Sequence, residues 1–218
     1  MARTRSSDYD AIQQSILDRT ADVFATRGYA ANSIGDIAKA CGCSKSRLYH
    51  YFDSKERILS TMLIEHVDQL LEGGHAVLQQ PIKPIEKFRA LLHFFLEIYA
   101  VSRSKHIVML TCIDFLPDEL RSEVVGKQRE LISFVRDILC ELRPEAATNR
   151  MQLHMDTMLF FGMINWTYTW YSAKGVISPQ ELADRCLSLF LSGFLNTENL
   201  LPHPPSDQQS PRIESISG

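Results

Sequence analysis

Closely spaced helix-capping signals in residues 33–57, SIGDIAKACGCSKSRLYHYFDSKER, constrain the fold of this chain more than any other feature. Ser33 can cap one helix, with Asp36 completing a capping box, and Ser44 can cap a second. Gly42 lies between them and permits the positive φ that commonly ends a helix. A further acidic pair opens a third helix near residue 54. The pattern predicts two short helices joined by a tight turn and followed at once by a longer helix.

The two short helices have distinct inner and outer faces. Ile34, Ile37, Ala38 and Cys41 form an apolar stripe on the first helix, and Leu48 and Phe52 form one on the second. The side chains left outside on the second helix are basic, hydroxyl-bearing or aromatic. A short helix of this composition, held by a tight turn against another helix, is typical of a helix that enters the major groove of DNA. The segment is therefore predicted to be a helix-turn-helix.

Charge along the chain supports this interpretation. Between Arg27 and Arg57 there are six basic and three acidic residues, a net charge of +3, whereas the whole chain carries −3 and its remainder −6. Phosphate contacts need local positive charge, and this asymmetry predicts one DNA-facing surface on an otherwise acidic protein.

The remaining sequence predicts an all-α fold, because it shows helical periodicity and no strand alternation. Besides the two motif helices, helices are expected over residues 9–27, 54–78, 84–99, 106–115, 118–142, 147–173 and 178–196. The apolar run 157–173 contains polar residues and is short for a membrane span, so a buried helix is the better interpretation. Residues 1–8 are predicted to be a flexible polar arm, and the Pro/Ser-rich residues 201–218 a disordered tail.

At this point the sequence resembles the N-terminal signature of the tetracycline-repressor (TetR/AcrR) family. The residues that carry the resemblance, over about residues 9–60, are Phe24, Gly28-Tyr29, Ser33-Ile34, Ile37-Ala38, Ser44-Lys45, Leu48-Tyr49, Tyr51-Phe52 and Lys55-Glu56. Asn32, Cys43 and Ser46-Arg47 depart from the usual residues. The last departure changes the base-facing surface, so no operator sequence can be transferred from the family.

The resemblance implies roles for the predicted DNA-binding residues, which are Ser33, Ser44, Lys45, Ser46, Arg47, Tyr49, His50, Tyr51 and Lys55. Ser33 would contact phosphate, as would Lys55, while Arg47 would read guanine bidentately. The alternative is that the aromatic residues only pack the small domain. We accept that alternative for Phe52 and for part of Tyr51.

The resemblance also implies the domain organisation. Residues 9–57 would form the helix-turn-helix DNA-binding domain, and residues 58–200 a larger helical ligand-binding and dimerisation domain. In this family the last two helices form the dimer, and a bound small molecule moves the two DNA-binding heads out of register with the operator. One short recognition helix reads few base pairs, so a homodimer on a palindromic operator is expected.

The segment 162–175 with residues 178–183 is similar to the corresponding region of regulators that sense acyl-CoA thioesters, including fatty acyl-CoA and phenylacetyl-CoA. Predicted effector-binding residues are Arg89, Phe95, Met109, Phe160, Met163, Asn165, Trp166 and Trp170. Arg103 or Lys105 are further candidates for a CoA phosphate. The plainer interpretation is that aromatic and Met residues at helical spacing form core.

Two other functions compete with a ligand-responsive repressor. One is a DNA-binding factor without an effector, whose body would be filled. The other is an enzyme with an incidental DNA-binding head, against which the chain lacks a nucleophile elbow, a P-loop and a dinucleotide fingerprint. We expect no catalytic residues, no cofactor and no metal site. Five scattered cysteines and a polar start without a signal-peptide pattern predict a cytoplasmic protein that does not engage the membrane.

Overall fold

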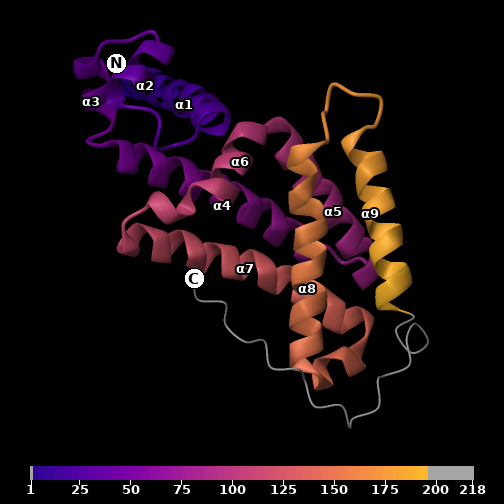
Figure 1. Cartoon of the computed structure of the whole chain (residues 1–218). Coiled ribbons are helices and arrows are strands. Elements are labelled where there is room, and N and C mark those ends of the chain that lie inside the picture. The colour runs from indigo at the N-terminus through magenta and orange to yellow at the C-terminus, as the bar shows by residue number, and fades with distance from the viewer. Residues whose placement is uncertain (1, 196–218) are drawn as a thin grey trace, which may run out of the picture.

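The computed structural model describes residues 2–195, with side chains from residue 8 onward. In this range nine α-helices and three short 3₁₀ segments, and no strands, make up the regular structure (Figure 1), which confirms the all-α fold class. The helices are α1 (Ala2–Arg27), α2 (Ile34–Ala40), α3 (Lys45–Tyr51), α4 (Lys55–Leu78), α5 (Pro84–Val101), α6 (Arg103–Thr111), α7 (Asp118–Leu142), α8 (Arg150–Asn165) and α9 (Pro179–Phe194). The 3₁₀ segments are η1 (Ile113–Phe115), η2 (Pro144–Thr148) and η3 (Trp166–Thr169).

Helices α1 to α3 form a small head, which contains the predicted helix-turn-helix, at one end of the molecule (Figure 1). Their inner faces meet around Leu17, Phe24, Ile37 and Leu48, which are all essentially buried. Gly42, in the turn between α2 and α3, has φ +66°, a conformation that favours glycine because a Cβ would be strained there. The turn predicted from the sequence is thus present.

Helix α4 runs from the head into the body without interruption. Gly73 and Gly74, which look like weak points in the sequence, are sites of close packing. A Cβ at Gly73 would lie 2.0 Å from Cζ of Phe94 on α5, and one at Gly74 would lie 2.7 Å from Cε2 of Phe134 on α7. The two glycines therefore let α5 and α7 approach α4.

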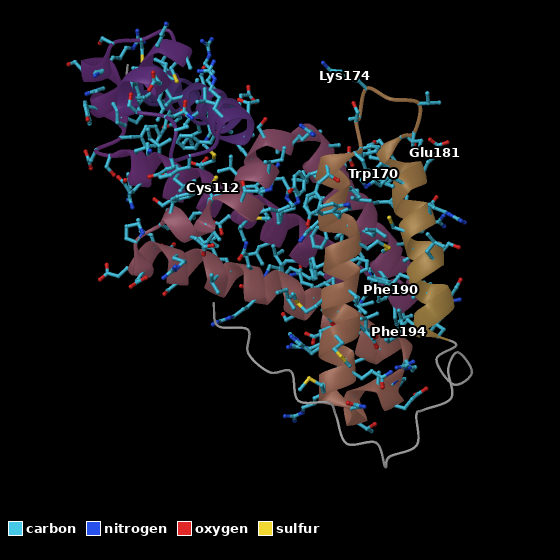
Figure 2. The ribbon with its side chains drawn as sticks, viewed as in Figure 1. Cys112, Trp170, Lys174, Glu181, Phe190 and Phe194 are labelled. Carbon is cyan, nitrogen blue, oxygen red and sulfur yellow. The ribbon has the colours of Figure 1, made fainter. Side chains whose placement is uncertain are left out.

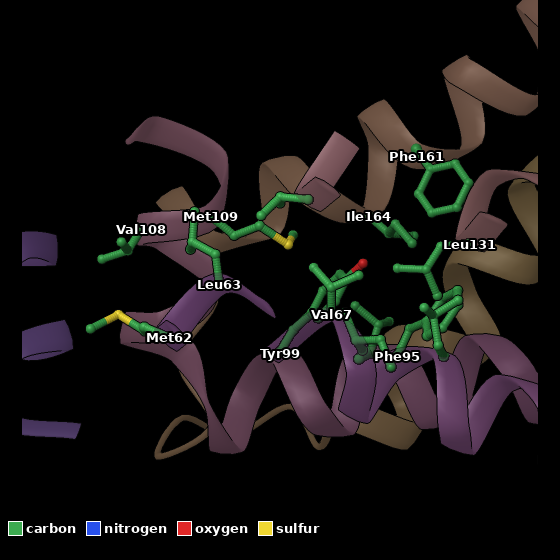
Figure 3. Packing of buried hydrophobic residues seen from close by; sticks show 14 of the residues in the cluster. Met62, Leu63, Val67, Phe95, Tyr99, Val108, Met109, Leu131, Phe161 and Ile164 are labelled. Atoms are coloured by element: carbon green, nitrogen blue, oxygen red, sulfur yellow. The ribbon is translucent and has the colours of Figure 1, made fainter. Parts of the chain in front are cut away.

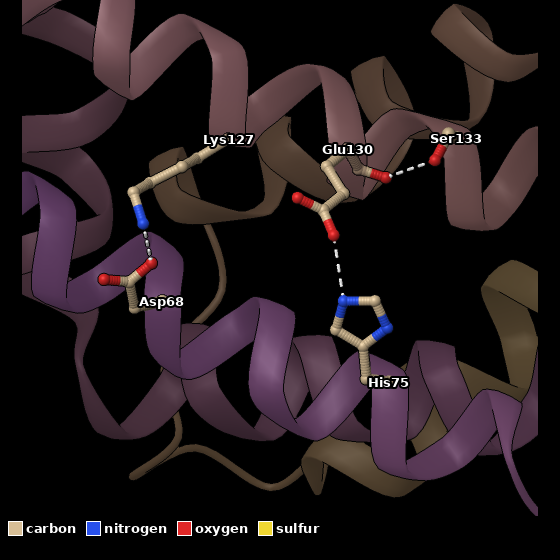
Figure 4. Close-up of polar contacts among 5 residues, drawn as sticks. All are labelled: Asp68, His75, Lys127, Glu130 and Ser133. Atoms are coloured by element: carbon tan, nitrogen blue, oxygen red, sulfur yellow. Dashed lines mark hydrogen bonds and ion pairs between the residues drawn. The ribbon is translucent and has the colours of Figure 1, made fainter.

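The body is layered around α5, which packs against α4, α7 and α9. One continuous apolar core joins α4 to α8 (Figure 3), with Val67, Phe95, Met109, Leu131 and Ile164 contributed by five different helices. On the outer side, α4 and α7 are joined by polar side-chain contacts (Figure 4).

Two pairs make these contacts: Lys127 and Asp68 form an ion pair, and Nε2 of His75 and Oε1 of Glu130 lie 2.9 Å apart in a hydrogen bond. Both pairs are partly exposed, so they contribute little compared with the core beneath them.

Several predicted helix boundaries differ from the structure. Helix α1 begins at Ala2, where a flexible arm over residues 1–8 was predicted, because no Pro or Gly interrupts the helix there. The segment predicted over 106–115 is instead α6, starting at Arg103, followed by η1. The predicted tail 201–218 lies outside the described residues.

The helix predicted over 147–173 was wrong in length, since α8 ends at Asn165 and the chain tightens into η3. Two threonine hydroxyls favour the change by donating to nearby carbonyls, Thr167 to Ile164 at 2.6 Å and Thr169 to Trp166 at 2.8 Å. Within residues 2–195, none of the helices combines the length and apolarity that crossing a membrane requires.

Candidate DNA-binding surface and effector site

Helix α3 presents most of its predicted DNA-binding residues to solvent. Ser44 caps it by accepting a hydrogen bond from the backbone N–H of Arg47 at 3.1 Å. Leu48 is fully buried, while the five predicted residues Lys45, Ser46, Arg47, Tyr49 and His50 are exposed. One face of α3 is thus anchored and the other is free to meet DNA.

Tyr51 and His50 lie partly against α1. The Tyr51 ring is 4.6 Å from that of Tyr9, and the His50 ring is 6.0 Å from it. Phe52 is buried, so its packing role is confirmed. Tyr51 is half-buried and packs at least on one side, as predicted for part of it.

Ser33 is already engaged with its capping partner. Both its backbone N–H and its hydroxyl donate to Oδ2 of Asp36, at 2.9 and 2.6 Å. These hydrogen bonds, the hydroxyl one first, lower the pKa of Asp36. A phosphate contact from Ser33 would therefore have to form beside a carboxylate.

Lys55 has a structural position that its sequence did not indicate. Its Nζ donates to the carbonyl oxygens of Tyr29 at 3.1 Å and Asn32 at 2.9 Å, and lies 3.9 Å from the centre of the Tyr29 ring. The ammonium thus joins two backbone carbonyls of the loop between α1 and α2 and holds that loop against the start of α4. The proposed phosphate contact remains a prediction, but two of its three donors are already used.

We predict that Lys55→Ala lowers the free energy of unfolding by about 1.5–3 kcal/mol, because a charged donor is lost from two partly buried carbonyls. Urea unfolding of both proteins measures this. Lys39→Ala, an exposed lysine of the same head, is the control and should change stability by less than about 0.5 kcal/mol. Equal stability of the two variants would contradict the structural role.

Helix α6 connects the head to the body. Lys105 forms an ion pair with Asp18 of α1 at 2.6 Å, and Ser104 donates to Asp22 of α1 at 2.6 Å. Just beyond α6, Phe115 stacks on Tyr29 of the head, with ring centres 4.9 Å apart. A shift of α6 would therefore disturb contacts with α1 and with the loop before α2.

The structure does not bring the predicted effector residues together around one cavity. Phe95, Met109 and Phe160 are buried core side chains, whereas Trp166 and Trp170 are 63% and 57% exposed. Arg89 of α5 pairs with Asp184 of α9, as the hydrogen bond from its Nε at 2.9 Å shows. Met163 and Asn165 are partly buried at the end of α8.

A polar group that the sequence did not single out lies deeper in the body. His66 of α4 and His106 of α6 are each 1% exposed, and Nε2 of His66 is 3.4 Å from Nδ1 of His106. Tyr99 stacks on His106 with ring centres 3.5 Å apart. The sequence carried little signal for this pair, because the two histidines are 40 positions apart and only their burial in the structure distinguishes them from the other histidines.

Burial lowers the pKa of His66 to about 4 and that of His106 well below its usual range, so both are neutral at pH 7. In the unfolded chain the two imidazoles take up protons near pH 6.5. The free energy of unfolding is therefore at its full value above that pH and falls as the pH drops toward 4.

Between pH 7.5 and pH 5, the free energy of unfolding of the wild type should fall by about 2 kcal/mol more than that of His66→Gln, as measured by urea unfolding. Equal losses would mean that other groups dominate the pH dependence.

Beside His106 is a small, partly open hollow of about 20 Å³ between α5, α6 and η3. Its lining comprises Leu96, Tyr99, Ala100, Arg103, His106, Thr167, Tyr168, Tyr171 and Ala173. Typical ligand pockets have about 300 Å³ or more, so an effector would have to widen this hollow. Within the described residues, no cluster of His, Cys, Asp and Glu is arranged to hold a metal ion.

An exposed apolar stripe runs along α8, opposite the face that packs on α7. The α8 apolar stripe consists of Met151, Met155, Met158 and Leu159 on α8 together with Trp166, the first residue of η3, each between 43% and 69% exposed. These positions recur at helical spacing, so they lie on one side of the helix. Helix α9 runs alongside α8 (Figures 1 and 2), and its Leu189 is also exposed. Several large exposed apolar side chains on one side of a helix are typical of an interaction surface.

Two family models match the chain. "Bacterial regulatory proteins, tetR family" matches residues 16–62, and "Tetracyclin repressor-like, C-terminal domain" matches residues 81–194. The first covers the head from within α1 to the first part of α4. The second covers more than half of the chain and most of the body.

Known proteins match over nearly the whole chain. A TetR-family transcriptional regulator from Bordetella parapertussis 12822 is 57% identical, with TM-score 0.82, over 88% of this chain and 98% of that one. The HTH-type transcriptional repressor KstR2 of Mycolicibacterium smegmatis is 26% identical over 203 residues, 91% of this chain and 98% of that protein. AibR, crystallised with isovaleryl coenzyme A and operator DNA, shares the fold at TM-score 0.71 and 23% identity, over 82% and 97% of the two chains. The chain therefore belongs to the tetR family of bacterial regulatory proteins, and it is a helix-turn-helix transcriptional regulator rather than an enzyme.

Proposed function

We propose that the protein is a repressor that binds a palindromic operator as a homodimer and is released by an acyl-CoA or aryl-CoA thioester. The exposed face of α3 is the observation that carries the DNA-binding part, because its basic and hydroxyl side chains are free while Leu48 anchors the helix. The relatives named as repressors support the direction of regulation.

The homodimer is supported by the α8 apolar stripe. A second copy related by a two-fold axis would cover this stripe with the same stripe, which is how self-complementary interfaces form. The two heads of the dimer would then bind two half-sites about one helical turn of DNA apart.

The effector class is supported by the AibR complex and by the resemblance of residues 162–183 to acyl-CoA sensors. The contacts of α6 with α1 support a route from the body to the head. The filled core around Phe160 favours the alternative of an effector-independent factor, and the two can be separated by experiment.

Release from DNA tests the proposal directly. Purified protein on its own promoter region is titrated with isovaleryl-CoA, octanoyl-CoA, phenylacetyl-CoA and CoA itself, and anisotropy reports the bound fraction. Release by at least one thioester, but not by CoA, is expected. If none of the thioesters shifts either DNA binding or the melting temperature, the effector class is wrong and the effector-independent alternative is favoured.

We predict that Arg47→Ala relaxes sequence preference at one base pair of each half-site by about 1–3 kcal/mol, because a guanidinium reads guanine through two hydrogen bonds. Binding to operator variants substituted at each position measures the preference. Arg129→Ala on α7 removes the same charge from an exposed site away from α3 and should leave the preference intact. An unchanged preference in Arg47→Ala would place base reading on other α3 residues.

A further inference from the structure

The His66–His106 pair leaves two buried nitrogen atoms without hydrogen-bond partners. These are Nδ1 of His66 and Nε2 of His106, and no described residue satisfies either. Native proteins rarely leave such groups unpaired, because the lost hydrogen bonds with water are not replaced. His106 lines the hollow between α5, α6 and η3, so a group that entered this hollow could satisfy it.

The surroundings of the hollow favour a ligand atom that accepts hydrogen bonds. Arg103, at the exposed mouth, carries only donors, and one of its nitrogens already donates to the carbonyl of Tyr168 at 2.8 Å. Leu96 and Ala100 supply apolar wall. The hollow holds about one water-sized group, which suits a single oxygen atom rather than a whole effector.

The protonation of the pair adds a second argument. A neutral imidazole has one N–H and one bare nitrogen. If His66 Nε2–H donates to Nδ1 of His106, then His106 must carry its own proton on Nε2 and can donate it into the hollow. The opposite arrangement would leave Nε2 bare. A ligand oxygen that accepts from His106 therefore selects one tautomer for both rings, on α6 and on α4.

We propose that this hollow is the subsite for the thioester carbonyl oxygen of the effector, with His106 Nε2–H as its donor and Arg103 at the mouth facing the anionic CoA portion. The stacked Tyr99 ring fixes the orientation of His106. The acyl chain enters by displacement of η3 and the loop that follows, where Trp170 and Lys174 lie at the outer end of the body (Figure 2). The inference rests on the proposed function, since it names how that effector is recognised.

Calorimetric titration of the full-length protein with isovaleryl-CoA, octanoyl-CoA, phenylacetyl-CoA, CoA and isovalerate tests the subsite. His106→Phe keeps a ring against Tyr99 but has no nitrogen, and it should weaken binding of the thioester by about tenfold or more. His75→Phe makes the same change at a partly exposed histidine of α4 and should bind as wild type does. Because a buried Phe can disturb folding, Arg103→Ala at the exposed mouth is the second variant, and it should weaken binding of thioester and CoA alike.

A direct readout comes from ¹⁵N-histidine spectra of the wild-type protein, assigned with the two histidine variants. Saturation with the tightest-binding thioester should place the proton of His106 on Nε2 and that of His66 on Nε2. Equal affinity of wild type and His106→Phe, or unchanged histidine signals on saturation, overturns the subsite while leaving the repressor intact. Binding of isovalerate with the same dependence on His106 as the thioester would assign the subsite to a carboxylate instead and overturn the thioester assignment. Failure of every thioester to bind the wild type overturns the proposed effector class and the subsite with it.

Discussion

Leu159→Glu is expected to convert the protein to a monomer and to weaken operator binding by about 100-fold or more, because an unpaired carboxylate would be buried at the centre of the interface. Leu159 is 68% exposed in a single chain and lies in the middle of the α8 apolar stripe. A two-fold axis would place the same carboxylate on both protomers, so two charges would be buried and would repel each other. Sedimentation velocity and DNA-binding titrations on one preparation measure both effects.

Val101→Glu is the matched control. Val101 is an exposed apolar residue, at 79%, at the end of α5 and outside the α8 apolar stripe. The Val101→Glu variant should have the oligomeric state and the DNA affinity of the wild type. A dimeric Leu159→Glu variant that still binds its operator tightly would place the dimer interface elsewhere on the chain.

Phe160→Ala is expected to lower the free energy of unfolding by about 3–5 kcal/mol and the melting temperature by roughly 10 °C. Phe160 is fully buried, and its ring centre lies 5.0 Å from that of Phe88 and 5.3 Å from that of Phe190. Its removal would leave a cavity where α5, α8 and α9 meet. Thermal and urea unfolding at one protein concentration measure the loss.

Tyr49→Ala provides the comparison, because Tyr49 is also aromatic but is half exposed on α3. The free energy of unfolding of the Tyr49→Ala variant should differ from that of the wild type by no more than about 0.5 kcal/mol. If Phe160→Ala melted as wild type does and instead bound thioesters more weakly, Phe160 would belong to an effector pocket and not to the core.

The head was largely predictable because its signals are local. Capping by Ser33 and Ser44 and the positive φ of Gly42 act over three or four residues, and α2 and α3 begin and end where those residues indicate. The exposed set on α3 follows from the same periodicity. Lys55 was harder to interpret, since its partners Tyr29 and Asn32 are carbonyls more than 20 positions away.

The body was predictable as helices but not as a site. Aromatic residues at helical spacing can line a pocket or fill a core, and Phe95 and Phe160 turned out to fill one. The end of α8 at Asn165 depends on threonine hydroxyls competing for carbonyls, a balance that apolar periodicity does not report. Nothing in the spacing of His66 and His106 indicated that their rings would meet.

By itself the sequence determined the class of the fold, the helix-turn-helix and the residues it exposes, because caps, glycine turns and apolar stripes are short-range and act through the backbone. Only the tertiary structure decided which side chains are engaged and which are free. Burial brought His66 and His106 together as a neutral pair, and packing left the α8 apolar stripe uncovered. Both outcomes depend on contacts between residues far apart in the chain, whose free energies arise only when the helices have packed.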